Sequence, residues 1–263
     1  MKSILVTGAG SGIGKATARY FAEQGWYVAL CDLNTESLQT VERELPADQC
    51  DSFPLDVTRY SDFERVIDSV SSRTDGRLDV LFNCAGIMRM GPFEEVSIED
   101  HHLTTEININ GVINGIYASL PLLKNTPGAR VITMSSAAAF YGVPDLAGYS
   151  ASKFAVRGLT EALNLEFEPY DIVVTDLMPL YVDTPMISSQ KYQAGTLRYF
   201  GTRLTAEDIA KVVWDATRER RIHWIPGLTL KALKFITRFF PFAERRAMRA
   251  FSKQKRKDLA SAG

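Results

Sequence analysis

The sequence predicts a single doubly wound α/β domain, in which a parallel sheet of about seven strands carries helices on both faces. Short runs rich in Val, Ile, Leu and aromatic residues alternate with longer segments whose apolar residues recur at helical spacing. Nearly every position in the short runs is apolar, which is typical of parallel strands that are buried on both faces. The 263 residues, 46% of them hydrophobic, are sufficient for one such domain.

The expected elements follow one another in a regular strand–helix order. The strands are expected at residues 3–7, 26–31, 52–55, 78–82, 129–134, 171–177 and 222–225. The amphipathic segments between them predict helices at 13–24, 35–45, 61–72, 100–124, 149–168 and 205–219. No internal repeat and no linker interrupts this order. Residues 1–227 are therefore expected to form one domain, and residues 228–263 a C-terminal extension.

The overall composition indicates a cytoplasmic protein. The formal net charge of −1 provides no general attraction to nucleic acid. The three cysteines (Cys31, Cys50 and Cys84) are odd in number and lack CxxC or metal-ligand spacing, which favours a reducing compartment and no metal site. No signal peptide is recognisable, and no run approaches the roughly 20 apolar residues of a spanning helix.

The C-terminal extension differs from the rest of the chain in charge. Residues 228–257 contain ten Lys and Arg residues against one acidic residue, Glu244, and they are interleaved with apolar and aromatic residues around Pro241. Two interpretations stay open. The segment packs on its own domain or at a subunit interface, or it lies as an amphipathic segment on an anionic membrane surface. Nucleic-acid binding is the least favoured interpretation.

The stretch TGAGSGIG, residues 7–14, is expected to bind the phosphates of a dinucleotide. It follows the first strand and opens the first helix. Gly8, Gly12 and Gly14 permit a tight turn and close approach of the backbone to a ligand. The amino end of the following helix favours a pyrophosphate. An ordinary glycine-rich turn is the alternative.

Asp32, at the end of the second strand, is expected to select NAD over NADP. It lies eighteen residues after Gly14, near the spacing at which a carboxylate accepts hydrogen bonds from the adenosine ribose. The same charge would repel a 2′-phosphate, and neither Ser11 nor Leu33 is a basic residue that would offset the repulsion. The alternative is that Asp32 caps the helix at 35–45, although Asn34 could do so instead.

The stretch YSASK contains a candidate acid/base pair. Tyr149 and Lys153 are four residues apart, so on a helix they share one face. A cation beside the phenol would lower the tyrosine pKa from about 10 and make it a general acid or base near neutral pH. A surface tyrosine beside a surface lysine is the alternative.

These motifs together resemble the short-chain dehydrogenase/reductase family. The glycine pattern is TGxxxGxG, and it is followed in order by YxxxK and by further matching segments, LDVT (55–58), NCAG (83–86), NING (108–111) and PLYVDTP (179–185). The resemblance covers residues 1–225 and implies a Rossmann-type domain with bound dinucleotide. The cofactor contacts that it implies are Gly8, Ser11, Gly12, Ile13, Gly14, Asp32, Leu33, Asp56, Val57, Asn83, Ala85, Gly86, Tyr149, Lys153, Pro179, Val182 and Thr184.

The resemblance also implies a catalytic tetrad of Asn108, Ser136, Tyr149 and Lys153. Tyr149 would exchange a proton with the substrate oxygen, and Ser136 would hold that oxygen. Lys153 would lower the phenol pKa and hydrogen-bond the nicotinamide ribose. Asn108 would kink its helix locally and anchor a water that links Lys153 to solvent.

Two tetrad assignments have neighbouring rivals. Asn110 competes with Asn108, and the family's N-x-x-G spacing to Gly111 favours Asn108. Ser135 competes with Ser136, and only the thirteen-residue interval from Ser136 to Tyr149 favours Ser136.

The expected substrate is an apolar secondary alcohol or its ketone, of steroid, retinoid or lipid type. No basic residue is expected to face it, since Arg89 is expected to face solvent, and Leu180 stands where the family usually has glycine. The positions expected to line the pocket are Met88, Ala137, Ala138, Phe140, Tyr141, Val143, Leu146, Leu180 and 186–200.

The sequence leaves two alternatives to a dehydrogenase function, and an oligomeric state is also expected. A non-catalytic nucleotide-sensing or scaffold protein would not need an intact tetrad. An epimerase or dehydratase would need further catalytic residues. By analogy with other proteins of this fold, a homodimer or homotetramer is expected through the helices at 100–124 and 149–168.

Overall fold

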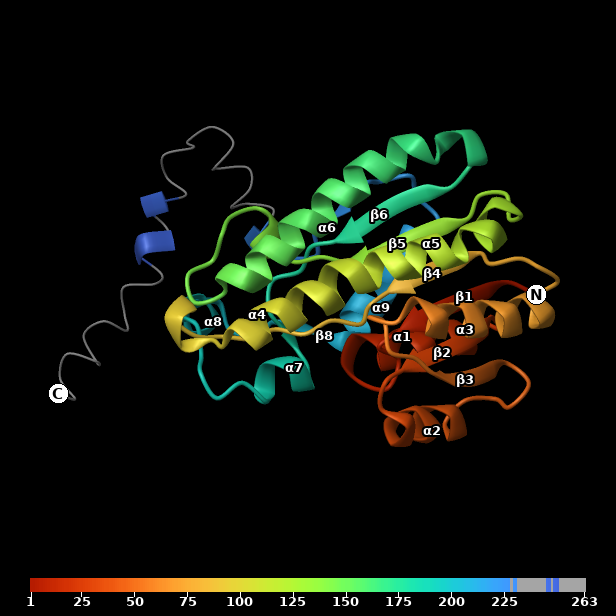
Figure 1. Cartoon of the computed structure of the whole chain (residues 1–263), viewed down its shortest axis with the longest axis horizontal. Coiled ribbons are helices and arrows are strands. Elements are labelled where there is room, and N and C mark those ends of the chain that lie inside the picture. Colours follow the sequence, from red (N-terminus) through yellow and green to blue (C-terminus); the bar gives the residue numbers. More distant parts are fainter. Residues whose placement is uncertain (228, 231–244, 247, 251–263) are drawn as a thin grey trace.

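The chain forms a parallel sheet of seven strands, as the alternating pattern predicts. The structure is a computed structural model that describes residues 1–227, 229–230, 245–246 and 248–250. The strand order is β3-β2-β1-β4-β5-β6-β9, and every pair in it is parallel (Figure 1). The strands are β1 (Ser3–Thr7), β2 (Tyr27–Asp32), β3 (Cys50–Pro54), β4 (Val80–Asn83), β5 (Arg130–Met134), β6 (Val173–Leu177) and β9 (His223–Trp224).

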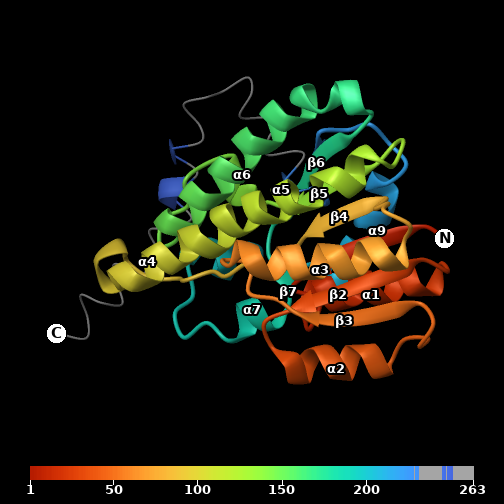
Figure 2. The same ribbon diagram turned by 45° about the vertical axis from the view of Figure 1, so that its right-hand side comes forward.

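Helices cover both faces of the sheet, because successive strand residues point to opposite sides. On β1, Leu5 packs with one cluster of buried side chains, whereas Ile4 and Val6 pack with the other. The first cluster includes α3 (Tyr60–Arg73), α5 (Gly111–Lys124) and α6 (Ala147–Glu166), which lie over the same face in Figures 1 and 2. The second includes α1 (Gly12–Glu23), α2 (Thr35–Arg43) and α9 (Ala206–Ala216).

The expected helix at 100–124 is interrupted. It consists of α4 (Ile98–Thr105), a π-helical turn (Glu106–Asn110) and α5. The extra residue of a π-helical turn shifts the following side chains around the axis. Here the turn buries Asn108 completely, while Gly111 packs so closely on Val57 that an added Cβ would lie 2.8 Å from its Cγ2. The expectation of one continuous helix was therefore wrong at its centre, and a π-helical turn stands where the resemblance implied a local kink at Asn108.

The segment that follows β6 contains elements that the sequence pattern did not predict. Two short strands, β7 (Val182–Asp183) and β8 (Leu204–Thr205), pair in parallel. Between them lie α7 (Pro185–Ser188) and α8 (Gly195–Phe200). This part of the chain is thus a compact excursion over the carboxyl end of the sheet rather than an irregular loop.

The two outer strands are short or interrupted. On one side, β3 ends at Pro54, whose nitrogen carries no hydrogen. On the other side, β9 has only two residues, and its His223 lies between two carboxylates. The Nδ1 atom is 2.9 Å from Asp176 Oδ1 on β6, and Nε2 is 3.1 Å from Glu161 Oε1 on α6. These contacts attach the last strand to its neighbours.

The carboxyl ends of the central strands lie level with one another. Thr7 is in register with Asn83, Asn83 with Thr133, and Thr133 with Asp176. Chain connections leave to opposite sides between β1 and β4, and this switch point is where doubly wound sheets open a crevice. The motifs that follow β1, β4, β5 and β6 therefore meet at one edge.

Most of the C-terminal extension, residues 228–263, lies outside the described residues, and of the predicted amphipathic segment only 229–230, 245–246 and 248–250 are described. The boundary at residue 227 remains a prediction. Among the residues that the structure describes, no helix is both long enough and apolar enough to cross a bilayer.

Candidate active site

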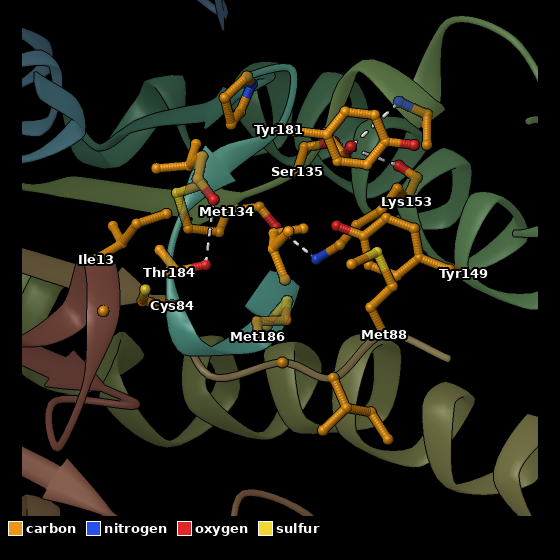
Figure 3. A pocket seen from close by; sticks show the side chains of 18 of the residues that line it. Ile13, Cys84, Met88, Met134, Ser135, Tyr149, Lys153, Tyr181, Thr184 and Met186 are labelled. Atoms are coloured by element: carbon orange, nitrogen blue, oxygen red, sulfur yellow. Dashed lines mark hydrogen bonds between the residues drawn. The ribbon is translucent and has the colours of Figure 1, made fainter. Parts of the chain in front are cut away.

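A cavity of about 650 Å³ opens at the carboxyl edge of the sheet and collects most of the predicted site residues (Figure 3). Those from the dinucleotide set that line it are Gly8, Ser11, Gly12, Ile13, Gly14, Asp32, Leu33, Asp56, Val57, Ala85, Gly86, Tyr149, Lys153, Pro179, Val182 and Thr184. Those from the substrate set are Met88, Ala137, Ala138, Phe140, Tyr141, Val143, Leu146 and Leu180, with Met186, Ile187, Thr196 and Phe200 from the 186–200 segment. Segments that are distant in the sequence therefore line the same cavity.

The glycine loop is packed too tightly for side chains. The hydroxyl of Thr7 accepts hydrogen bonds from the backbone nitrogens of Cys84 and Ala85, both at 3.1 Å, and so joins the ends of β1 and β4. Gly8 has φ of +72°, and an added Cβ would lie 2.9 Å from Ala85 Cα. A Cβ on Gly14 would lie 2.0 Å from the Gly8 carbonyl oxygen. The loop therefore presents bare backbone, which suits a bulky anion at the amino end of α1.

Asp32 is held by backbone N–H groups and does not cap a helix. Its Oδ2 accepts from the Gly10 nitrogen at 2.8 Å, and its Oδ1 accepts from the Asn34 nitrogen at 2.9 Å. The cap of α2 is Asn34, whose side chain accepts from the Ser37 nitrogen at 2.9 Å. The capping alternative for Asp32 is therefore wrong. Its carboxylate is fixed in direction at the cavity wall, where it can accept further hydrogen bonds.

Asp56 has a similarly fixed carboxylate. Its Oδ1 accepts from the nitrogen and the hydroxyl of Thr58, at 3.0 and 2.8 Å. Asn83, by contrast, is buried at the end of β4 and is not among the residues that line the cavity. An added Cβ on Gly115 of α5 would lie 2.5 Å from Asn83 Oδ1. The structure thus places Asn83 beneath the site rather than at its surface.

Asn108 also lies behind the cavity wall, where its side chain joins two segments. Its Oδ1 accepts from the Ile87 nitrogen, and its Nδ2 donates to the Ile87 carbonyl, both at 2.9 Å. The same Nδ2 donates to the Ser152 hydroxyl at 3.1 Å, which donates to the Tyr149 carbonyl at 2.7 Å. The rival Asn110 bonds Glu106 at 2.8 Å instead. These contacts favour Asn108 over Asn110 as the asparagine associated with the site.

Ser136 rather than Ser135 is the hydroxyl associated with Tyr149. Burial raises the pKa of the Tyr149 phenol, and a hydrogen bond with Ser136 partly offsets that rise. Ser135 is buried and donates to the Lys153 carbonyl at 3.5 Å. The Ser136 hydroxyl also accepts from the Ala138 nitrogen at 3.2 Å, which fixes its position.

The electrostatics of Tyr149 and Lys153 differ from the simple expectation. Burial raises the pKa of Tyr149 to about 12, against the lowering by Ser136 and with a further rise from Tyr181. Burial lowers the pKa of Lys153 to about 8. The Nζ of Lys153 donates to the Met134 carbonyl at 2.7 Å and is 5.5 Å from the centre of the Tyr149 ring (Figure 3). The predicted lowering of the phenol pKa by Lys153 is therefore not found, because desolvation dominates both groups.

One basic residue of the cavity wall was missed. Arg157 lies two helical turns after Tyr149 on α6 and lines the cavity, contrary to the expectation of a wall without cations. Its guanidinium lies 5.5 Å from the ring centre of Phe140 and bonds Glu161 at 2.8 Å. The repeated spacing of four residues from Tyr149 was the available signal. Arg89 is exposed and pairs with Asp100 at 2.7 Å, as expected for a residue that faces solvent.

Comparisons with known proteins agree with this geometry. The family model described as short chain dehydrogenase matches residues 2–194. Cyclohexanol dehydrogenase of Acinetobacter sp. is 32% identical over 216 residues, which cover 81% of this chain and 86% of that protein.

Two solved structures carry cofactors. A 3-ketoacyl-(acyl-carrier-protein) reductase from Brucella melitensis, complexed with NADH, aligns with a TM-score of 0.77 at 26% identity and covers 86% of this chain and 96% of its own. An alcohol dehydrogenase from Thermococcus sibiricus, complexed with 5-hydroxy-NADP, aligns with a TM-score of 0.76 at 29% identity and covers 86% and 95%.

The buried ammonium of Lys153 predicts a pH-dependent gain in stability when it is removed. Its pKa is about 8 in the folded protein and 10.5 ordinarily. The penalty is therefore complete below pH 8 and vanishes above about 10.5, where lysine is neutral in both states. The shift corresponds to about 3 kcal/mol of penalty below pH 8. The bond lost at Met134 costs about 1 kcal/mol at every pH, so Lys153→Met should gain a net of about 2 kcal/mol at pH 7 and lose that gain as the pH rises to 10. Denaturant unfolding between pH 7 and 10 measures this difference.

The control is Lys211→Met, which changes an exposed lysine on α9. It should alter the free energy of unfolding by no more than about 0.5 kcal/mol across the same range. A difference between Lys153→Met and the natural protein that stays constant from pH 7 to 10 would contradict the assigned pKa of Lys153.

Proposed function

The chain belongs to the short chain dehydrogenase family of oxidoreductases, and from that premise we propose that it interconverts an apolar secondary alcohol and its ketone with NAD as cofactor. The observation that carries the proposal is the meeting of Ser136, Tyr149 and Lys153 with the glycine loop in one cavity. A bound nicotinamide dinucleotide would supply or accept the hydride. The chain itself supplies orientation and proton transfer.

The residues of the glycine loop and the Asp32 carboxylate fit the dinucleotide. The bare backbone between Gly8 and Gly14 would take the pyrophosphate, and Asp32 would accept hydrogen bonds from the adenosine ribose. Solved relatives of this fold carry either an NAD-type or an NADP-type cofactor, so the choice depends on local charge. The preference for NAD rests on the negative charge of Asp32 and the exposed, uncharged Leu33 beside it.

Tyr149 would transfer the proton. With a pKa of about 12 it is protonated near neutral pH, and it can donate to the oxygen of a ketone as hydride arrives at the carbon. The Ser136 hydroxyl would hold that oxygen. In the direction of alcohol oxidation the phenolate is needed, and a charged Lys153 would stabilise it if Nζ turned from Met134 toward the phenol.

The non-catalytic alternative is not favoured. A scaffold or nucleotide sensor would have no use for a phenol, a hydroxyl and an ammonium positioned around one cavity. Asn108, which is completely buried, further ties the turn bearing Tyr149 to the segment after β4. Polar and titratable side chains that are held in place around one cavity are typical of catalytic sites.

The apolar wall supports an apolar substrate. The side chains of Met88 and Leu146 are buried in a cluster that Tyr149 and Met186 also contact. The name of the similar cyclohexanol dehydrogenase indicates an alicyclic secondary alcohol. We therefore assign alicyclic or lipid-like alcohols and ketones as the substrate class.

The outer faces of two helices support a homodimer. Ile113 and Tyr117 on α5 are 43% and 68% exposed, and Phe154 and Leu165 on α6 are 43% and 65% exposed. Exposed large apolar side chains on the helices of one face are typical of protein interfaces. The same helices were expected, by analogy with other proteins of this fold, to form the contact of a homodimer or homotetramer.

Tyr149→Phe should lower kcat by at least about a hundredfold, the low end for loss of a general acid or base. The change removes one hydroxyl and keeps the ring, so dinucleotide binding should persist. Nicotinamide absorbance with cyclohexanol and cyclohexanone measures turnover, and fluorescence titration with NADH measures binding. Turnover near that of the natural protein in the folded variant would remove Tyr149 from its role.

The Asp32 carboxylate should give at least a tenfold preference in kcat/KM for NAD over NADP, since hydrogen bonds to a charged acceptor contribute about 1.5–3 kcal/mol each. Asp32→Asn should reduce the ratio severalfold or more. Glu36→Gln removes a nearby charge on the first turn of α2 and should leave the ratio unchanged. An equal or higher kcat/KM with NADP in the natural protein would show that Asp32 does not select NAD.

The described part of the extension supports packing on the domain rather than on a membrane. Leu230 is 4% exposed, and both Leu230 and Met248 line the cavity. The full-length protein should therefore remain in the supernatant with anionic phosphatidylserine vesicles, as with neutral phosphatidylcholine vesicles. Salt-sensitive co-sedimentation with the anionic vesicles alone would instead support the membrane surface.

A further inference from the structure

Two hydroxyl groups meet in the otherwise apolar wall of the substrate half of the cavity. The Tyr181 hydroxyl and the Thr196 Oγ1 are 2.7 Å apart, and both residues line the cavity. Thr196 is only 4% exposed and lies in the first turn of α8, between the buried Ala194 and Leu197. A pair of hydroxyls so placed is unexpected in a site built solely for hydrocarbon.

The pair belongs to the same chamber as the reacting phenol. Tyr181 and Tyr149 both pack against the cluster of Met88, Leu146 and Leu197. Figure 3 shows Tyr181, Tyr149 and Met88 around the same space. A molecule whose oxygen contacts Tyr149 would therefore extend past the Tyr181–Thr196 pair.

A count of hydrogens shows that the pair has one donor to spare. Each hydroxyl carries one hydrogen, and whichever residue donates within the pair uses one of the two. Among the hydrogen bonds of the residues that the structure describes, neither hydroxyl has a second partner. The remaining hydrogen and the open lone pairs are available to a molecule in the cavity. Buried hydroxyls are ordinarily satisfied, so a ligand oxygen is the natural partner.

We propose that Tyr181 and Thr196 bind a second oxygen of the substrate, so that the preferred substrate is an apolar alcohol or ketone with a further hydroxyl or carbonyl group on its skeleton. The proposal rests on the function assigned to the site. The proposal narrows the substrate class from ketones with one oxygen to ketones that carry a second oxygen. The reacting oxygen lies at Tyr149 and Ser136, and the second oxygen lies at the Tyr181–Thr196 pair.

A bracing role is the rival explanation. The pair also connects the segment after β6 with α8, so its loss could loosen the whole wall. Loosening would affect substrates with and without a second oxygen alike. A lost hydrogen bond to substrate would affect only those that have one. The test therefore compares matched substrates within each variant.

The experiment measures kcat/KM of the full-length protein for two matched pairs. Cyclohexane-1,4-dione is compared with cyclohexanone, and decalin-1,5-dione with 1-decalone, which samples two separations between the oxygens. Thr196→Val and Tyr181→Phe each remove one hydroxyl with little change of shape. In both variants the ratio of dione to monoketone should fall at least about tenfold for the better dione, because a site built to bond an oxygen discriminates strongly. The monoketone should change by less than about threefold.

Tyr192→Phe is the matched control. It makes the same chemical change in the same segment, and Tyr192 does not line the cavity. Its ratio should equal that of the natural protein. An unchanged ratio in Thr196→Val and Tyr181→Phe, or an equal loss for dione and monoketone, would overturn the proposal.

Direct binding separates this proposal from the assigned function. If the natural protein reduces none of the four ketones with NADH or NADPH, the assigned function is wrong for this class. Calorimetric titration of the same ketones then tests the pair alone. Tighter binding of a dione than of its monoketone, lost in Thr196→Val, supports the proposal. Equal binding of both, or no binding of either dione, refutes it.

Discussion

The buried amide of Asn108 is the contact on which the geometry of the site depends. It bonds Ile87 through both its oxygen and its nitrogen, and through Ser152 it reaches the backbone of Tyr149. The segment after β4, the π-helical turn and the first turns of α6 are thereby held in one arrangement. An unpaired amide at such a depth would be costly, so the three segments can separate only together. The π-helical turn is what allows the side chain to point inward at this position.

The regular parts of the fold could be predicted because they depend on local periodicity. Apolar runs and amphipathic segments located every strand of the main sheet, and glycine and tyrosine motifs located the residues around the cavity. The interruption at 106–110 could not be derived from periodicity, because the π-helical turn depends on contacts of Asn108 with residues far along the chain, and only the family resemblance implied a local kink there. The contact of Tyr181 with Thr196 is of the same kind. It joins two irregular segments whose approach no spacing rule describes.

Burial accounts for the electrostatic difference between expectation and structure. Spacing alone places Tyr149 and Lys153 on one face and suggests mutual stabilisation of their charged forms. The cavity is apolar, however, and desolvation opposes charge on both groups, so the phenol pKa rises and the ammonium pKa falls. Near neutral pH the phenol of Tyr149 is therefore neutral, whereas Lys153, with a pKa of about 8, is still mostly charged. The environment that excludes water thus sets the protonation state from which the reaction starts. Arg157 has its charge compensated by Glu161, which lies one turn further along α6 and does not line the cavity.

The two edge strands of the sheet limit the ways in which copies of the chain could associate. An edge strand with free N–H and C=O groups invites pairing with another chain, and long, flat edges promote aggregation. Here one edge stops at Pro54 and the other is a strand of only two residues, secured by His223 to carboxylates on its own domain. Neither offers a long template for a foreign strand. Among the residues that the structure describes, the sheet thus offers little room for growth by strand addition. Copies of the chain that associated would have to meet through side chains on helices, where complementary shape limits the number of subunits that can join.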